Sequence, residues 1–268
     1  MKSLMQVMSE IVDNFSILRR IARFNVRSKW ADNYLGSVWD YLEPLIYIGT
    51  YFVVFGMGLY GGTVNGHPYL TWLFTGIIPW YYIQGSFNKG ISSISSQLNL
   101  LTKMRFPISV APVMPMLEEL RRFFFMSIVM VIVLLAFGVY PSVHWLQFVY
   151  AFIAMVATVL AHNLINSTLA VLIPDYKAAI NALFRLLFFT SGVIVNMDNG
   201  RLPYMLATFI KMFPFYYVLE QFRDSFLNGV WFWQHGSNMI FFWLLTLLML
   251  IFGSVVHMRF RDRFIDML

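Results

Sequence analysis

The feature that most constrains the fold is an apolar stretch from Leu146 to Ile173 that contains no Asp, Glu, Lys or Arg. The hydrocarbon core of a bilayer is about 30 Å thick, and a helix of roughly 20 apolar residues crosses it. Further apolar runs occur along the chain, and one water-soluble core could not bury them all. Composition agrees, because 59% of the residues are hydrophobic and only 12% are charged. Soluble domains carry about 25% charged residues, so the sequence predicts an integral membrane protein.

The predicted fold is an all-α integral membrane protein with six transmembrane helices. Residues 1–34 form an N-terminal amphipathic interface helix, and residues 196–237 form a re-entrant external helical hairpin between spans five and six. The fifth span is short and carries Arg185. The six spans are expected at residues 35–59, 69–90, 110–139, 146–173, 178–195 and 238–258.

The basic residues orient these spans. Cytoplasmic loops of membrane proteins carry an excess of Lys and Arg. With both termini in the cytoplasm, only Arg201, Lys211 and Arg223 of the 19 Lys and Arg residues lie outside. The N- and C-termini are therefore predicted to be cytoplasmic. The net charge of +6 reports topology in this chain, so no nucleic-acid partner is inferred from it.

The N-terminal segment combines an apolar stripe with a basic face. Its apolar residues recur at steps of three and four, which places them on one side of a helix: Leu4, Met8, Ile11, Phe15, Leu18 and Ala22. Arg19, Arg20, Arg23 and Arg27 occupy much of the remaining surface. Such a helix lies in the membrane interface with its basic groups toward anionic headgroups. Two roles stay open, a simple anchor or a platform for a cytoplasmic partner or an anionic lipid-linked substrate.

Residues Gly90 to Arg122 precede the apolar part of the third span and are too polar to cross as a whole. Apolar side chains between Leu98 and Phe106 stand beside Lys103 and Arg105 there. An exposed apolar helix of this kind is either a docking surface for another protein or a helix resting on the bilayer. Further on, Glu118, Glu119, Arg121 and Arg122 have the spacing of ion pairs along one helix. Their predicted role is structural.

The external segment contains two apolar stretches, Leu202 to Phe213 and Phe215 to Leu227, separated by Pro214. Neither is long enough to span. Broken helices at membrane depth occur where protein or a water-filled cavity surrounds them, which favours a re-entrant hairpin that caps a pathway. Glu220 and Arg223 are spaced to pair on its second arm. A hairpin lying flat on the outer surface is the alternative.

Several kinds of chemistry are missing from the sequence. It contains no G-x-x-x-x-G-K-[ST] phosphate loop and no H-E-x-x-H metal motif. It also lacks cysteine, so it has no thiol nucleophile and no thiolate metal site. His162 lies at membrane depth beside Asn163 and Asn166, where helix packing is favoured over a substrate contact. No catalytic residue, metal site or cofactor is therefore expected, and energy must come from a partner.

Several segments resemble the permeases of ABC-2 type polysaccharide exporters. They are Ser28-Lys29-Trp30, Tyr34-Leu35-Gly36-Ser37-Val38-Trp39, Leu42-Glu43-Pro44-Leu45, Lys103-Met104-Arg105-Phe106-Pro107, Pro174-Asp175-Tyr176, Phe213-Pro214-Phe215-Tyr216-Tyr217 and the C-terminal run from His257 to Phe264. The resemblance covers essentially the whole chain. Within this class, the segments Gly76 to Trp80 and Tyr140 to Phe148 look most like the wall teichoic acid exporter permeases of Gram-positive bacteria.

The resemblance implies that residues 1–268 form a single ABC-2 type transmembrane domain in the plasma membrane of a bacterium. It also implies a homodimer of permeases with two nucleotide-binding ATPase subunits, which use ATP and Mg. The substrate would be an undecaprenyl-diphosphate-linked anionic polymer, namely wall teichoic acid. An ATPase-coupling segment is implied at Asn99, Leu100, Leu101, Thr102, Lys103, Met104, Arg105, Phe106 and Pro107. Arg27 and Lys29 are candidates for the diphosphate head group, and Tyr217, Glu220 and Arg223 for an external gate.

Other interpretations remain open at this point. Within the same family, the cargo could be an O-antigen or a capsular polysaccharide, or a small lipid or drug. A membrane enzyme acting on polyprenyl phosphate would need grouped acidic residues to hold a divalent metal, and the acidic residues here are mostly separated. An accessory assembly protein without a transport role is the third alternative.

Overall fold

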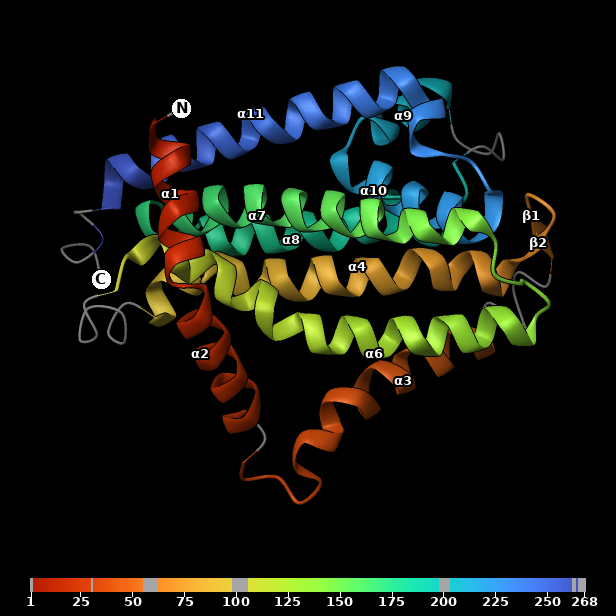
Figure 1. Cartoon of the computed structure of the whole chain (residues 1–268), viewed down its shortest axis with the longest axis horizontal. Coiled ribbons are helices and arrows are strands. Elements are labelled where there is room, and N and C mark those ends of the chain that lie inside the picture. The colour runs from red at the N-terminus through yellow and green to blue at the C-terminus, as the bar shows by residue number, and fades with distance from the viewer. Residues whose placement is uncertain are drawn as a thin grey trace.

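The computed structural model describes residues 2–29, 31–54, 62–97, 106–197, 203–261 and 264. Within these ranges the chain is mostly helical, with one small antiparallel hairpin of β1 (Thr63–Val64) and β2 (His67–Pro68). Five helices run side by side along the longest axis of the molecule (Figure 1). They are α4 (Tyr69–Ile91), α6 (Met114–Ala136), α7 (Phe148–Leu172), α8 (Tyr176–Thr190) and α11 (Gly236–Phe260).

Shorter elements occupy the two ends of this bundle. The N-terminal helices α1 (Lys2–Asp13) and α2 (Phe15–Ser28) lie at the end that also holds the last described residues. The turn η1 (Gly36–Val38) leads into α3 (Trp39–Tyr51), and α2 and α3 form a V on one side of the bundle (Figure 1). The opposite end carries the β-hairpin, η4 (Val143–Gln147), α9 (Tyr204–Lys211) and η6 (Phe232–His235). The turn η3 (Ile108–Val113) precedes α6, and α10 (Pro214–Arg223) continues into the π-helical turn η5 (Asp224–Asn228).

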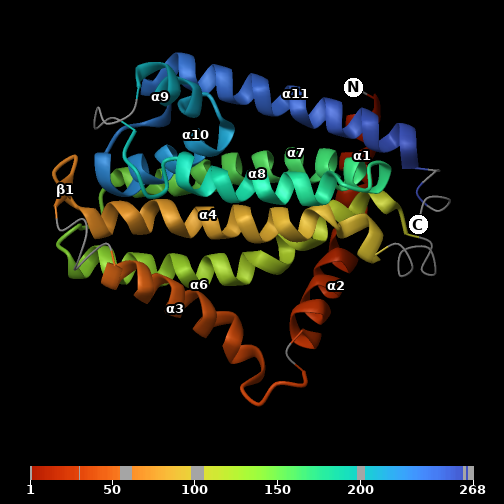
Figure 2. The ribbon, with the colours of Figure 1, turned by 180° about the vertical axis from the view of Figure 1, so that it is seen from behind.

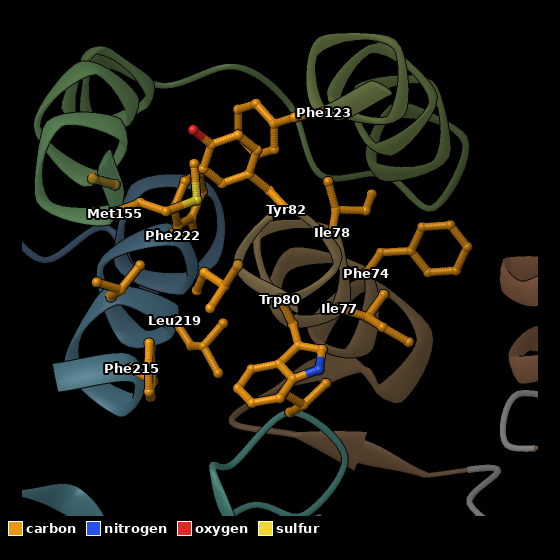
Figure 3. Close-up of a cluster of buried hydrophobic side chains, with 14 of the residues drawn as sticks. Phe74, Ile77, Ile78, Trp80, Tyr82, Phe123, Met155, Phe215, Leu219 and Phe222 are labelled. Atoms are coloured by element: carbon orange, nitrogen blue, oxygen red, sulfur yellow. The ribbon is translucent and has the colours of Figure 1, made fainter. Parts of the chain in front are cut away.

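Helix α4 is the centre of the core. Most of its residues are apolar and buried, as expected for a helix surrounded by others. The Trp80 ring stacks on Phe184 of α8 at 5.3 Å and meets Phe215 of α10 edge-on at 6.2 Å. Tyr82 packs against Phe123 of α6 with ring centres 5.4 Å apart. Figure 3 shows these side chains filling the space around α4, so α4 holds α6, α8 and α10 in place.

Two helical segments in the described ranges are long and apolar enough to cross a membrane, Val143–Leu172 and Phe232–Phe260. The first covers the predicted fourth span up to Leu172, and the second contains the predicted sixth span. Helix α6 has four charged residues, Glu118, Glu119, Arg121 and Arg122, within its first turns. Helix α8 has only 15 residues, about 22 Å at 1.5 Å per residue. The structure thus agrees with a mostly helical membrane protein, whereas the count of six spans and the re-entrant hairpin stay predictions.

The N-terminal segment is two helices where the sequence predicts one, because the chain bends at Asn14. The predicted apolar stripe is divided between the protein and its surroundings. Ile11, Leu18 and Ala22 are buried, whereas Met8 and Phe15 are exposed. Helix α1 packs against α11 and η3, and Arg261 donates a hydrogen bond to Glu10 at 2.9 Å. The segment therefore packs on the bundle through its buried residues, and its place in the membrane interface stays a prediction.

Pro214 separates two helices with different environments. Because proline lacks an N–H and fixes φ near −65°, it is well suited to the first position of a helix, and α10 begins with it. Helix α10 is buried along most of its length against α4 and α7. Helix α9 is exposed except at Ala207 and Ile210. The two arms therefore differ in burial, since α10 belongs to the core and α9 to the surface.

Candidate functional site

A cavity of about 450 Å³ lies between α3, α4, α6 and α8. We call it the tyrosine cavity, because aromatic rings from three helices line it together with polar side chains. Its main lining residues are Glu43, Tyr47, Tyr51, Tyr81, Gln84, Asn88, Arg122 and Phe188. Figure 2 shows α3 and α8 on opposite sides of α4.

Helical spacing explains why these side chains share one cavity. Tyr47 and Tyr51 stand four residues apart, so both project from one face of α3. Tyr81, Gln84 and Asn88 follow one another by three and four residues along α4. The Tyr47 and Tyr81 ring centres are 6.2 Å apart. The two helices therefore present facing rows of side chains. The row on α3 is aromatic, and the row on α4 combines an aromatic ring with amides.

The lining suits a polar, ring-shaped ligand. Aromatic faces pack against the C–H groups of a sugar, and the tyrosine hydroxyls and amides can exchange hydrogen bonds with its hydroxyls. Tyr51 also approaches Phe188 of α8 with ring centres 6.1 Å apart, so the cavity has a second aromatic wall. Charged groups occur only at one end among the described lining residues, where Glu43 and Arg122 stand 3.5 Å apart.

Charged side chains form a connected ion network at that end. It consists of Asp40 and Glu43 on α3, Lys89 on α4, and Glu118, Glu119, Arg121 and Arg122 on α6. Lys89 contacts Glu118 at 3.0 Å and Glu119 at 2.8 Å. The network thus fastens the end of α4 to the start of α6.

Asp40 connects α3 to the same network. It forms an ion pair with Arg121, and its other oxygen lies 3.7 Å from Arg122. The backbone carbonyl of Asp40 also accepts a hydrogen bond from Arg122 at 3.3 Å. Because Asp40 is buried, its charge depends on these two arginines for compensation. Helix α2 joins through Asn25, which donates to Glu118 at 2.9 Å.

The ion network carries more negative than positive charge, with four carboxylates and three cations. Lys29 adds a further cation to the lining of the cavity beside this network. The predicted pairing along α6 is found for Glu119 and Arg122 at 3.5 Å. The other described pairs of this network reach to α3 or α4, which sequence spacing along one helix does not reveal.

The predicted head-group residues differ in position. Lys29 lines a cavity of about 220 Å³ that the ion network borders. Arg27 is exposed near the end of α2 and does not line that cavity. The structure therefore brings Lys29, but not Arg27, to the described charged groups.

Most of the predicted coupling segment, Asn99 to Arg105, lies outside the described residues. Phe106 and Pro107 are described and half-buried. Phe106 packs on the apolar cluster formed by α1, η3 and Phe264. This cluster lies at the end of the bundle that holds the N-terminal helices (Figure 1).

The three predicted gate residues lie on α10 but face different surroundings. The Tyr217 hydroxyl lies 2.8 Å from that of Tyr150, and its ring stacks on Phe242 at 4.3 Å. Tyr217 and Glu220 line a second cavity, of about 510 Å³. Arg223 is buried and donates to Glu220 and to the Gly192 carbonyl, both at 2.6 Å. Its position is that of a cross-link within the bundle.

Sequence reasoning did not single out Tyr47, Tyr51, Tyr81 or Asp40. The four-residue spacing of Tyr47 and Tyr51 was available as a signal. However, the chain has 14 tyrosines, and such a spacing gains meaning only when a facing helix is known. In the sequence, Asp40 is a single acidic residue near the start of the predicted first span, and nothing there indicates its partners.

Comparisons with known proteins assign the chain to a protein family. Residues 18–227 match the family of ABC-2 type transporters. The chain is 23% identical over 255 residues, 95% of each chain, to the "O-antigen export system permease protein RfbA" of Klebsiella pneumoniae. It is 25% identical over 196 residues to the protein of that name in Myxococcus xanthus, covering 73% of this chain and 74% of the relative.

Proposed function

Since the chain belongs to the ABC-2 type transporter family, we propose that it is the permease subunit of an ATP-driven exporter of a lipid-linked polysaccharide. The observation that carries this proposal is its similarity, along 95% of its length, to a permease named for O-antigen export. The helical bundle and its apolar spans support a role within the membrane.

The energy source is proposed to be a separate ATPase. The chain has no phosphate loop for ATP, and a permease of this family acts with ATP-hydrolysing subunits. We propose that two permeases and two such subunits form the complex, and that Asn99 to Pro107 receives the movement of the ATPase. Phe106 supports this assignment, because its packing on the cluster of α1, η3 and Phe264 offers a route from that segment into the bundle.

The tyrosine cavity is the proposed contact for the sugar chain. Its rings and amides offer many weak contacts to sugars along α3 and α4. A polymer that must keep moving requires contacts of this kind, because a deep charge trap would hold it. Arg27 and Lys29 are proposed to attract the diphosphate head before the polymer enters, and Tyr217 and Glu220 to border the exit. For Arg223, burial supports a role in holding that exit in shape.

Two cargoes are candidates. The names of the relatives favour an O-antigen type polysaccharide. Wall teichoic acid is the second candidate, favoured by the resemblance of Gly76 to Trp80 and of Tyr140 to Phe148.

The decisive experiment reconstitutes the chain in liposomes with its candidate ATPase partner and measures ATP hydrolysis. A neutral lipid-linked O-polysaccharide should stimulate hydrolysis more than a lipid-linked teichoic acid analogue. The reverse order would favour the second candidate. If no ATPase associates with the chain, the proposal of an exporter fails. Replacing Phe106 by Ala should reduce the stimulation, whereas replacing the exposed Tyr140 by Ala should leave it unchanged.

A further inference from the structure

The second cavity lies far from the tyrosine cavity. Its volume is about 510 Å³, and α9, α10, η6 and α11 line it. We call it the hairpin cavity. No described residue lines both cavities. Helices α9 and α11 lie along one edge of the molecule and α3 along the opposite edge (Figures 1 and 2). The hairpin cavity is therefore separate from the tyrosine cavity, although Tyr217 and Glu220, which are proposed to border the exit, line it.

One side of the hairpin cavity borders an apolar surface. Three residues of α9 turn outward with exposed fractions of 84% for Tyr204, 85% for Met205 and 60% for Phe209. Exposed apolar residues gathered on one helix are typical of contact with a membrane or a partner. Because the chain is a membrane protein and α9 lies at one end of the bundle, the surface fits the boundary between lipid tails and headgroups.

The other side of the hairpin cavity presents separated charges. Lys211 stands at the end of α9, and Glu220 and His235 line the cavity from α10 and η6. Glu220 accepts from Arg223 at 2.6 Å, and His235 lies 2.8 Å from Asp224. The total charge of these groups is therefore small, although a cation and a carboxylate both face the cavity.

We propose that the hairpin cavity binds the headgroup of an aminophospholipid such as phosphatidylethanolamine. Lys211 contacts the phosphate, and Glu220 with the nearby rings of Tyr217 and Phe242 receives the ammonium group. The acyl chains lie along the exposed residues of α9. A zwitterionic headgroup fits a lining with separated charges of both signs, whereas a purely anionic headgroup leaves Glu220 without a partner in the ligand.

Native mass spectrometry of the delipidated full-length chain, titrated with defined lipids, tests this proposal. Phosphatidylethanolamine should bind more tightly than phosphatidylglycerol. Lys211→Ala should weaken both lipids by about tenfold, since both carry a phosphate. Glu220→Gln keeps a hydrogen-bond acceptor for Arg223 and should weaken only phosphatidylethanolamine. The matched control is Lys177→Ala, an exposed lysine at the start of α8, which should change neither affinity.

Thr208→Trp tests the same proposal in a second way, because the larger side chain fills the hairpin cavity without changing a charge. It should weaken both lipids and decides the outcome if Lys211→Ala fails to fold, as judged by gel filtration. Equal binding of both lipids to the wild type and to all variants would overturn the proposal. Displacement of the lipid by a soluble neutral oligosaccharide would also overturn it and assign the cavity to sugar. The assay uses neither ATP nor transport, so its result is independent of the proposed function.

Discussion

The guanidinium carbon of Arg223 lies 3.6 Å from the centre of the Trp72 ring. This contact joins α10 to α4 through a cation over an aromatic face, an interaction that strengthens when water is excluded. Hydrogen bonds from Arg223 to the carbonyls of Gly192 and Val193 extend the link to the chain after α8. One buried side chain thus holds three parts of the bundle together.

Replacing Arg223 by Ala should destabilise the protein strongly. Removal of one partner of a buried ion pair leaves the other uncompensated and costs about 3–5 kcal/mol. The loss of stability should fall at the lower end of this range because Glu220 is partly exposed. Thermal unfolding in detergent measures the effect. Arg185→Ala is the control, because Arg185 is exposed on α8, and an equal shift in Tm for both variants would contradict the cross-link.

Gly76→Ala tests the same contact from the side of α4. A Cβ at Gly76 would lie 2.6 Å from a terminal guanidinium nitrogen of Arg223. Overpacking of this kind costs about 1–3 kcal/mol, so Tm should fall. Gly49→Ala on α3 has open space around its Cβ, and it should be neutral or stabilising by about 1 kcal/mol through helix propensity. A change in Tm of the same sign for both variants would count against the close approach of Arg223 to Gly76.

Asp40 and Glu43 should differ in importance although both belong to the ion network. The Asp40 side chain is 9% exposed and that of Glu43 is 42% exposed. Because burial decides the value of an ion pair, Asp40→Asn should cost about 3 kcal/mol, the lower end of the range for a buried pair, and Glu43→Gln less than about 1 kcal/mol. Unfolding measured at low and high salt separates them further, since salt should weaken only the exposed pair. A larger loss of stability for Glu43→Gln than for Asp40→Asn would contradict the greater importance of the buried carboxylate.

Changes in the tyrosine cavity should reduce transport more than they reduce basal ATP hydrolysis. Tyr81→Ala removes a ring from the cavity wall, whereas Tyr81→Phe keeps the ring and loses only the hydroxyl. Loss of one aromatic contact of about 1.5 kcal/mol lowers polymer affinity by about tenfold. Polymer-stimulated ATP hydrolysis, titrated with lipid-linked polymer, should therefore require more polymer for Tyr81→Ala, with Tyr81→Phe intermediate. An unchanged titration for Tyr81→Ala would exclude the cavity from the sugar path.

The sequence by itself determined the class of the protein and the approximate positions of its helices. The stretch from Leu146 to Ile173 identified a membrane helix, and Pro214 predicted the break between α9 and α10. The missing phosphate loop predicted a separate energy source. These features are local, since hydrophobicity, helical periodicity and backbone restrictions depend on neighbouring residues along the chain.

Only the tertiary structure decided which helices face one another and therefore which residues act together. Asp40 and Arg121 are 81 positions apart, and their pairing depends on α3 lying against α6. Tyr47 meets Tyr81 across α3 and α4 to wall the tyrosine cavity. Arg223, predicted at a gate, turns into the core because Gly76 leaves room for it beside Trp72. Contacts between distant segments depend on the packing of whole helices, and no spacing along one helix contains that information.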